Sequence, residues 1–414
     1  MSRVIPASRS VSSNAWWREP WVLVTAGGIV MGLALGVRHV EGLFMLPVVS
    51  DRGWTRASFA FAMAIQNLAW GVSQPLTGMI ADRFGAARVV AASLALYALG
   101  LYAMAHATTP GAFVWSAGVC VGVALSGTAF GAVYGAINRL VAPARRSWAL
   151  GVAGAIGGFG QFAMVPTAQV LMARAGWTGA LVALAVLMAM LMPLALPLRE
   201  NAAPAVVERE QALLPALREA FAQRGFWLLN AGFLACGFQL AFVATHLPAY
   251  VLDKGLRAVD GVAALAIVAL TNTAGIWFFG LLGATRRRKH LLAGIYLVRT
   301  SAMALFVLLP ISQATLFTFA AVMGFVWLGV VPLTNGIVSQ VFGVRYINTL
   351  FGFVFLGHQL GAFLGVWLGG VLFVATRSYD LMWLVAMALG VLAAALHWPI
   401  DDRTLARGPA GALA

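Results

Sequence analysis

Long runs of apolar residues, separated by short polar stretches, recur along the whole chain. Each run is about 20 residues or longer, which is the length that a helix needs to cross the hydrocarbon core of a bilayer. The pattern predicts twelve membrane-spanning helices, at residues 21–47, 57–80, 88–107, 112–138, 148–173, 178–198, 226–250, 260–283, 290–309, 314–340, 349–375 and 380–399. The first run is too long for a signal peptide and lacks a small-residue cleavage site, so we expect the mature protein to retain it.

The composition agrees with a membrane protein. Hydrophobic residues make up 61% of the chain and charged residues only 10%, whereas about 25% of the residues in an ordinary soluble domain are charged. A soluble enzyme or binding domain is therefore excluded as the class of protein, and the lipid bilayer is expected to be its surroundings.

The basic residues behind the net charge of +14 are concentrated in the loops on one side of the membrane. If the N-terminus is cytoplasmic, 19 of the 27 Lys and Arg residues fall in segments that face the cytoplasm and 6 in segments that face the other side. This alternation is the positive-inside rule. We therefore expect a multi-pass membrane protein with both termini in the cytoplasm. The basicity indicates topology and not a nucleic-acid partner. The two remaining cations, Arg38 and Arg299, lie inside predicted spans.

One long polar stretch, residues 199–225, divides the spans into six and six. Arg218 and Glu219 lie in it, in a predicted short surface helix. We predict an N-terminal six-helix bundle over residues 1–198, a cytoplasmic linker over 199–225 and a C-terminal six-helix bundle over 226–414.

A repeat supports this division. The segments GMIADRFGAARVVA (78–91) and GLLGATRRRKHLLA (280–293) align without gaps at an offset of 202 residues. Each follows the second span of its half and precedes the third. Parallel repeats of six helices are typical of one transporter architecture.

The first copy of the repeat resembles the G-x-x-x-D-R-x-G-x-x-[RK] signature of the major facilitator superfamily, through Gly78, Asp82, Arg83, Gly85 and Arg88. The segment RGWTRASF (52–59) resembles the Gly-Trp-Ser/Thr-Arg element of its bacterial monocarboxylate-transporter-like branch. That branch also carries a charged pair on the eighth helix, where residues 260–283 offer only Asp260 and Asn272. The resemblance implies an all-α membrane protein with twelve transmembrane helices in two six-helix bundles, the major facilitator fold.

The signature loop is a candidate gate. Asp82 follows the end of a predicted helix and can pair with an arginine or cap a neighbouring helix. Such a charge cluster would hold the two bundles together on the cytoplasmic side in one state and release them in another. The alternative is that Arg83 and Arg88 only mark topology.

Polar side chains are shared unevenly among the spans. The third, sixth and twelfth have almost none, and the ninth has only Arg299. The resemblance implies that these four helices pack outside and that the other eight surround a central cavity, where intramembrane polar groups are expected. The candidate substrate-binding residues are Arg38, Gln66, Tyr134, Gln161, Gln239, Asn335, His358 and Gln359.

Arg38 allows two interpretations. It can snorkel outward or pair with Glu41, one helical turn away. It can instead bind a substrate carboxylate in the cavity with two parallel hydrogen bonds. Glu41 would then carry a coupled proton or serve only as the resting partner of the arginine.

The remaining ionisable residues in the spans have their own alternatives. His358 lies near the middle of its span and is the second candidate for proton coupling, because histidine titrates near physiological pH. It can equally be a histidine that is hydrogen-bonded between helices. For Arg299 we expect an inward-facing structural role against backbone carbonyls or Asn272.

Glycines suggest tight helix packing. Gly357, Gly361, Gly365 and Gly369 recur every four residues in the eleventh span. Such a ridge of small residues lets two helix backbones approach closely. We interpret these glycines as packing residues and not as ligand sites.

Enzyme signatures are missing from the sequence. It contains no H-E-x-x-H, no G-x-S-x-G, no clustered Cys/His set and no P-loop. We therefore predict no catalytic residues, no metal, no cofactor and no ATP-driven transport.

The predicted function is secondary active transport of a small organic anion, a carboxylate, by alternating access. Its partners would be the small-molecule substrate, protons and lipid, and we expect a monomer. The alternative is proton-antiport efflux of an amphipathic metabolite or drug, with an apolar cavity lined by Trp70, Phe130, Phe159, Trp277 and Trp327. A receptor of the same fold stays open as a third reading.

Overall fold

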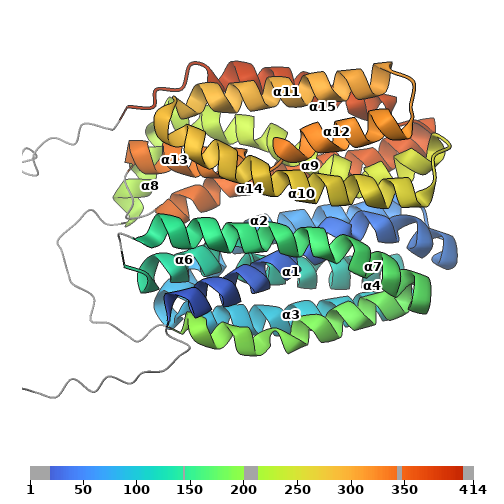
Figure 1. Cartoon of the computed structure of the whole chain (residues 1–414), viewed down its shortest axis with the longest axis horizontal. Helices are drawn as coiled ribbons and strands as arrows, with labels where there is room; N and C mark the ends of the chain where they lie inside the picture. The colour runs from blue at the N-terminus through green and yellow to red at the C-terminus, as the bar shows by residue number, and fades with distance from the viewer. Residues whose placement is uncertain (1–18, 143–144, 200–212, 343–346, 404–414) are drawn as a thin grey trace, which may run out of the picture.

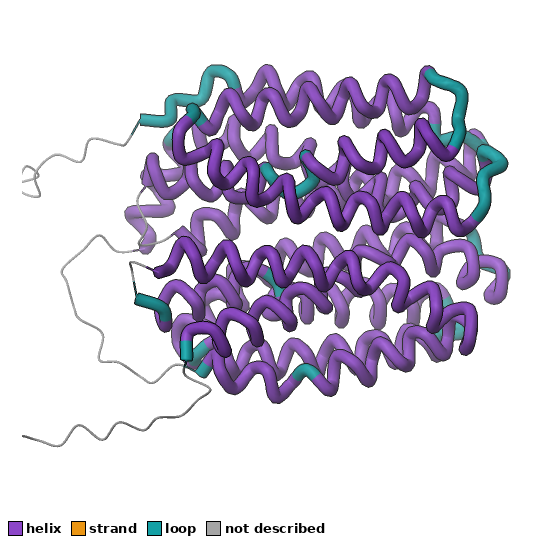
Figure 2. Tube along the Cα trace, in the orientation of Figure 1, coloured by secondary structure: helices purple, strands orange, loops and turns teal. Residues whose placement is uncertain are grey.

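A computed structural model describes residues 19–142, 145–199, 213–342 and 347–403. Helices and loops account for all of this described part, and it contains no β-strand (Figure 2). The helices lie side by side along the long axis of the molecule, in two halves that follow one another in sequence (Figure 1). The described chain begins and ends at the same end of this bundle, which an even number of crossings requires.

The first half runs from α1 to η4. Its elements are α1 (Pro20–Arg52), α2 (Arg56–Phe84), α3 (Ala86–His106), α4 (Pro110–Phe113), the π-helical η2 (Val114–Cys120), α5 (Val121–Thr128), α6 (Phe130–Leu140), α7 (Arg146–Met190) and the 3-10 helix η4 (Met192–Leu198).

The second half begins at α9. Its elements are α9 (Arg224–Asp253), α10 (Ala258–Thr285), α11 (Arg288–Leu308), α12 (Gln313–Phe325), α13 (Val330–Phe342), α14 (Ile347–Thr376) and α15 (Asp380–His397). Between the halves lies the short α8 (Leu213–Ala222), which contains Arg218 and Glu219 as predicted. The bundle and linker boundaries themselves stay a prediction, and residues 200–212 lie outside the described part.

These elements make twelve crossings, as the hydropathy pattern predicts. Ten stretches of the described part are long and apolar enough to cross a membrane. One of them, residues 148–198, contains two crossings, because the chain turns back at Gly176 (Figure 1). The twelfth is α2, whose 29 residues are long enough, but whose polar side chains, such as Gln66 and Asn67, leave it less apolar than the other crossings.

Three helix pairs form most of the contact between the halves. α2 packs along α14, α7 packs against α10, and α1 packs against α9. By contrast, α3, α11 and α15 pack mainly against helices of their own half and lie at its outer edge (Figure 1). The inner and outer positions therefore follow the distribution of polar residues in the sequence.

Two crossings predicted as continuous helices are interrupted. The fourth consists of α4, η2, α5 and α6, with a break at Ala129 (φ −90°, ψ −155°). The tenth consists of α12 and α13, which are separated by residues 326–329. Interrupted helices leave backbone groups unpaired, so other groups must bind them.

The glycine ridge of α14 packs on α9. A Cβ atom at Gly361 or Gly365 would meet the backbone of Leu234 or Phe238. The two helix axes are therefore closer than side chains would allow, and α9 and α14 form one tight pair. This is the packing role that the spacing of the glycines predicts.

Gly176 is expected to be indispensable for the turn between the fifth and sixth crossings. Its φ of 67° and ψ of 177° lie in a region that is essentially restricted to glycine, and a side chain there costs about 1–3 kcal/mol. Gly176→Ala should therefore lower the midpoint of thermal unfolding of the purified protein in detergent.

Gly151→Ala on the same helix is the matched control. Gly151 has helical geometry and open space at its Cβ position, so alanine should be neutral or slightly stabilising there. Equal midpoints for the two variants would show that the backbone at Gly176 is not strained by a side chain.

Candidate functional site

A cavity of about 60 Å³ lies between the two halves. Its polar lining consists of Arg38, His39, Gln161, His358 and Gln359, and its aromatic lining consists of Trp70, Phe130, Phe233, Trp327 and Phe355. In this measure one water molecule needs about 10–15 Å³, so the cavity has room for about four to six. A ligand that fills it has few non-hydrogen atoms.

Arg38 presents its guanidinium to this cavity from α1. Its Nη2 donates to Asn67 Oδ1 on α2, and its Cζ lies 5.3 Å from the centre of the Trp70 ring. The Nε atom is buried and has no hydrogen-bond partner. Among the described residues, no carboxylate forms an ion pair with Arg38, so the guanidinium keeps donors for a ligand.

Glu41 has a different partner. Its Oε1 accepts a hydrogen bond of 2.7 Å from Gln66 Nε2, which also donates to Ala117 O at 3.0 Å. Glu41 and Gln66 are both buried, 7% and 1% exposed, and neither lines the cavity. The pairing of Arg38 with Glu41 that the sequence suggests is thus not formed in this conformation.

The second half contributes a histidine and an amide from α14. His358 Nδ1 and Gln359 Oε1 are 2.9 Å apart. The His358 ring stacks on Phe355, with centroids 5.5 Å apart and 7° between the planes, and lies 4.7 Å from the Phe233 ring. Gln359 Nε2 is buried without a partner. Both polar side chains therefore line the same cavity as Arg38, from the other half, and the rings of Phe233 and Phe355 lie beside them.

His39 and Gln161 complete the polar lining. His39 Nε2 donates to Leu265 O on α10 at 3.0 Å, which joins the two halves, and its ring lies edge-on to Trp327 at 6.5 Å. Gln161, on α7, is 6% exposed. Gln161 is one of the predicted binding residues and His39 is not, although the position of His39 next to Arg38 is a signal that could have identified it.

Four predicted binding residues do not line the cavity: Gln66, Tyr134, Gln239 and Asn335. Gln239 Nε2 donates to Ala386 O on α15 at 2.9 Å, so its side chain lies on the outer face of α9. Tyr134 packs on Phe130, one turn away, at 5.7 Å. Gln239 therefore lies on a cavity helix but on the wrong face, and Tyr134 lies on the face of Phe130 but one turn beyond the cavity, which a list of polar residues per span does not resolve.

The aromatic residues named for an apolar cavity divide in the same way. Trp70, Phe130 and Trp327 line it. Phe159 and Trp277 are 63% and 69% exposed on the outside of the bundle.

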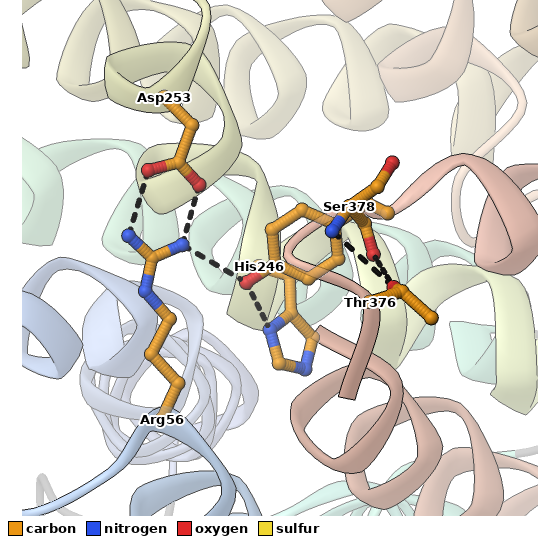
Figure 3. Close-up of polar contacts among 6 residues, drawn as sticks. Arg56, His246, Asp253, Thr376 and Ser378 are labelled. Carbon is orange, nitrogen blue, oxygen red and sulfur yellow. Dashed lines mark hydrogen bonds and ion pairs between the residues drawn. The ribbon is translucent and has the colours of Figure 1, made fainter. Parts of the chain in front are cut away.

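An ion pair joins the halves (Figure 3). It connects the start of α2 to the end of α9, at the end of the bundle opposite the first and last described residues (Figure 1). Arg56 Nη1 and Nη2, on α2, donate to the two carboxylate oxygens of Asp253, on α9, at 2.5 and 2.7 Å. The Arg56 guanidinium also lies over the Phe373 ring of α14 at 4.1 Å. Arg56 is the second arginine of the RGWTR segment at residues 52–56.

A chain of hydrogen bonds continues from this pair into the second half. Arg56 Nη1 donates to Tyr379 Oη at 3.4 Å, and Tyr379 Oη lies 3.2 Å from His246 Nδ1. His246 Nε2 donates to Val366 O at 2.9 Å, so Nδ1 of the neutral ring accepts from the tyrosine. Burial raises the pKa of Tyr379 to about 12, which keeps its hydroxyl a donor.

The signature residues lie at the opposite end. Gly78 belongs to the last turns of α2, Gly85 separates α2 from α3, and Arg88 is exposed on α3. A small cleft there is lined by Gly78 together with Pro75, Arg139 and Thr349. The side chains of Asp82 and Arg83 lie outside the described part, so the gating role of this cluster stays a prediction.

Comparison with known proteins agrees with this architecture. The Major Facilitator Superfamily model matches residues 24–366. The uncharacterized MFS-type transporter YcxA of Bacillus subtilis is 24% identical over 391 residues, which cover 89% of this chain and 92% of that protein. Monocarboxylate transporter 13 of Rattus norvegicus is 27% identical over 384 residues, which cover 89% and 86%.

Solved structures share the fold. A bacterial homologue of the human lysosomal transporter Spinster, in an inward-facing and unoccupied conformation, superposes with a TM-score of 0.72 over 92% of this chain and 96% of that one, at 13% identity. Its inward-facing and occupied form gives a TM-score of 0.71. With the match over most of its length, twelve crossings and a cavity between two halves, this chain belongs to the Major Facilitator Superfamily and is one of its transporters.

Proposed function

We propose that this transporter moves small organic anions with a carboxylate group across the bacterial inner membrane, by alternating access and coupled to protons. The observation that carries the proposal is the guanidinium of Arg38, which faces the central cavity and forms no ion pair with any carboxylate of the described residues. We further propose that the protein acts as a monomer with both termini in the cytoplasm.

The charge balance of the cavity supports an anionic substrate. A buried cation is costly unless an anion or several hydrogen bonds compensate it. Arg38 has one hydrogen bond to Asn67 and a contact with Trp70, so a bound carboxylate would supply the missing charge through two parallel hydrogen bonds. His358 and Gln359 can add polar contacts from the other half.

The size and the walls of the cavity favour a short acid. A space of about 60 Å³ suits a molecule of a few non-hydrogen atoms, and Phe355 and Trp327 offer apolar contact to its carbon chain. The resemblance to monocarboxylate transporter 13 points in the same direction. The alternative, export of a larger amphipathic compound, would need a cavity that opens much wider.

The ion pair of Arg56 and Asp253 suggests which side is closed. It ties the halves at the end opposite the first and last described residues, which is the periplasmic end in the proposed topology. The conformation would then be closed outward, as is that of the inward-facing Spinster homologue. Breaking this pair would be one step of alternating access.

Glu41 is the leading candidate for the coupled proton. It is a buried carboxylate on the same helix as Arg38 and has only an amide partner. With Arg38, a monoanion and a protonated Glu41, the moving charges sum to zero, which lowers the cost of crossing the hydrocarbon. His358 is the second candidate.

Arg38 should decide carboxylate binding. Arg38→Gln should weaken the binding of a short monocarboxylate by on the order of 100-fold, because the substrate charge would be buried without a partner. Arg38→Lys should weaken it by about tenfold, because an ammonium cannot make the bidentate contact. Isothermal titration with purified protein and uptake into proteoliposomes measure both effects.

Arg52→Lys is the matched control, because Arg52 lies on the same helix and over a tryptophan ring, Trp177 at 5.1 Å, but outside the cavity. Normal carboxylate binding by Arg38→Gln would refute the proposed substrate class. If amphipathic cations or neutral compounds then bound instead, export would be the better reading.

Glu41→Gln should separate binding from coupling. The neutral amide mimics the protonated acid, so substrate binding and exchange should persist while accumulation driven by a pH gradient is lost. Asp260→Asn is the control, because Asp260 is also buried but pairs with Arg257 at a helix start. Intact pH-driven accumulation in Glu41→Gln would assign the proton elsewhere, and His358→Gln would then be tested.

Loss of the Arg56–Asp253 pair should open the outer end. Ala249 is buried one turn from Asp253, and a cysteine there reports access for an impermeant maleimide. Asp253→Asn should raise its labelling rate by about tenfold, and adding Arg56→Gln should change it little further, because the two residues act as one unit. Arg257→Gln, which breaks a pair inside one half, should leave the rate unchanged. Equal rates in all variants would mean that the pair does not hold this end closed.

A further inference from the structure

The tenth crossing is broken in the middle. α12 ends at Phe325 and α13 begins at Val330, so residues 326–329 form a non-helical link. The N–H groups of Val326 and Trp327 still donate to the end of α12, at Val322 O and Gly324 O, but the carbonyls of the link do not continue the helical hydrogen-bond ladder. In a membrane such groups must be bound by other parts of the protein.

Arg299 binds the carbonyls of this link. Its side chain, on α11, is fully buried. Nε and Nη2 donate to Val326 O at 3.1 and 2.5 Å, and Nη2 also donates to Trp327 O at 2.5 Å. A cation at the C-terminal end of a helix is also favoured by the helix dipole.

Asn272 binds the link from another helix. Its Oδ1, on α10, accepts a hydrogen bond of 3.0 Å from the backbone N–H of Leu328. Three successive residues of the link, Val326 to Leu328, are therefore held by two side chains from two helices. The sequence led us to expect Arg299 against carbonyls or Asn272, and the link explains why both residues are needed there.

The same link forms a wall of the cavity. Trp327 and Leu328 line it, and the Trp327 ring stands edge-on to His39, the neighbour of Arg38. A shift of the link backbone would therefore move the surface that faces Arg38. Arg299 lies behind this wall and does not line the cavity itself.

An ion pair does not explain the choice of arginine. Among the described residues no carboxylate pairs with Arg299, so its burial brings no ion pair to the fold. A continuous helix satisfies its own carbonyls and would not need a guanidinium. The planar fork is suited to two neighbouring carbonyls, which only a broken helix presents.

We propose that Arg299 and Asn272 are positioning residues that fix the 326–329 link and thereby set the length of the carboxylate that fits against Trp327. The proposal deepens the proposed function and rests on it for the identity of the substrate. The link is held as a fixed wall, while Arg38 supplies the binding charge.

The test uses the full-length protein and two readouts. Variants are Arg299→Lys, which keeps the charge but not the fork, and Asn272→Leu, which keeps the volume but not the acceptor. The first readout is the fluorine NMR signal of Trp327 in protein labelled with 5-fluorotryptophan, assigned through Trp327→Phe. The second is KM and kcat for straight-chain monocarboxylates of increasing length in proteoliposomes.

Both variants should shift or broaden the Trp327 signal without any substrate. They should also change the KM ratio between long and short acids by on the order of tenfold, which is the range for one methylene in an apolar pocket, with a smaller effect on kcat. Asn230→Leu is the matched control. It removes a bond from α9 to Phe353 O of 3.3 Å, outside the cavity, and should change neither readout even if it lowers thermal stability.

An unchanged Trp327 signal and an unchanged length preference, with lower stability, would overturn the proposal in favour of a structural role. The effect of Arg299→Lys on length preference should also disappear in a Trp327→Ala background, and its persistence there would equally overturn it. If the wild-type protein transports no carboxylate, the proposed function fails, whereas the fluorine signal still decides whether Arg299 positions Trp327.

Discussion

A guanidinium group buried in a membrane protein has to be compensated, and three arginines of this chain meet that demand in three ways. Arg299 is bound by backbone carbonyls, which cannot leave. Arg56 is bound by Asp253 of the other half, which can separate from it. Arg38 has an amide and an aromatic face but no carboxylate. The carbonyls that bind Arg299 are permanent partners, whereas Asp253 and a substrate carboxylate would be partners that can leave. In a transporter the first kind suits the interior of one half, and the second kind suits the contact between the halves.

The permanent partners, the carbonyls that bind Arg299, lie within the second half. The link at 326–329 and the tight pair of α9 and α14 hold Trp327, Phe233 and His358 as one body in the second half. The exchangeable compensation lies between the halves, at the outer ion pair and in the central cavity. Motion between the halves can therefore proceed without any cation in the interior of one half losing its partner.

The fold could be predicted from the sequence because it follows from sums over many residues. Runs of about 20 apolar residues, alternating loop charge and polar inner helices each average over local detail. The direction in which one side chain points from its helix depends on local detail and cannot be obtained from such an average. Gln239 lies on a cavity helix, yet a rotation of about 100° per residue decides whether its side chain reaches the cavity, and packing sets that rotation.

The partners across helices were also beyond the sequence. Nothing in the spacing joins Arg38 to Asn67 or Glu41 to Gln66, because these pairs depend on the register between α1 and α2. The broken tenth crossing did leave a signal, since Gly324, Gly329 and Pro332 interrupt an apolar run. Glycine and proline inside a span point to a discontinuous helix near the binding site, so they could have predicted the break beside Trp327, a residue that the sequence already suggested for the cavity.

The polarity of α2 has a consequence for how the chain enters the membrane. α2 is less apolar than the ten stretches with the highest hydropathy, so lipid by itself is a poorer environment for it than for them. Its long interface is with α14, which begins at Ile347, 263 residues after α2 ends at Phe84. At about 5–20 residues per second this separation takes roughly 13–50 s of synthesis. During biogenesis α2 thus depends on α1 and α5, or on the insertion machinery, until the second half arrives to shield it.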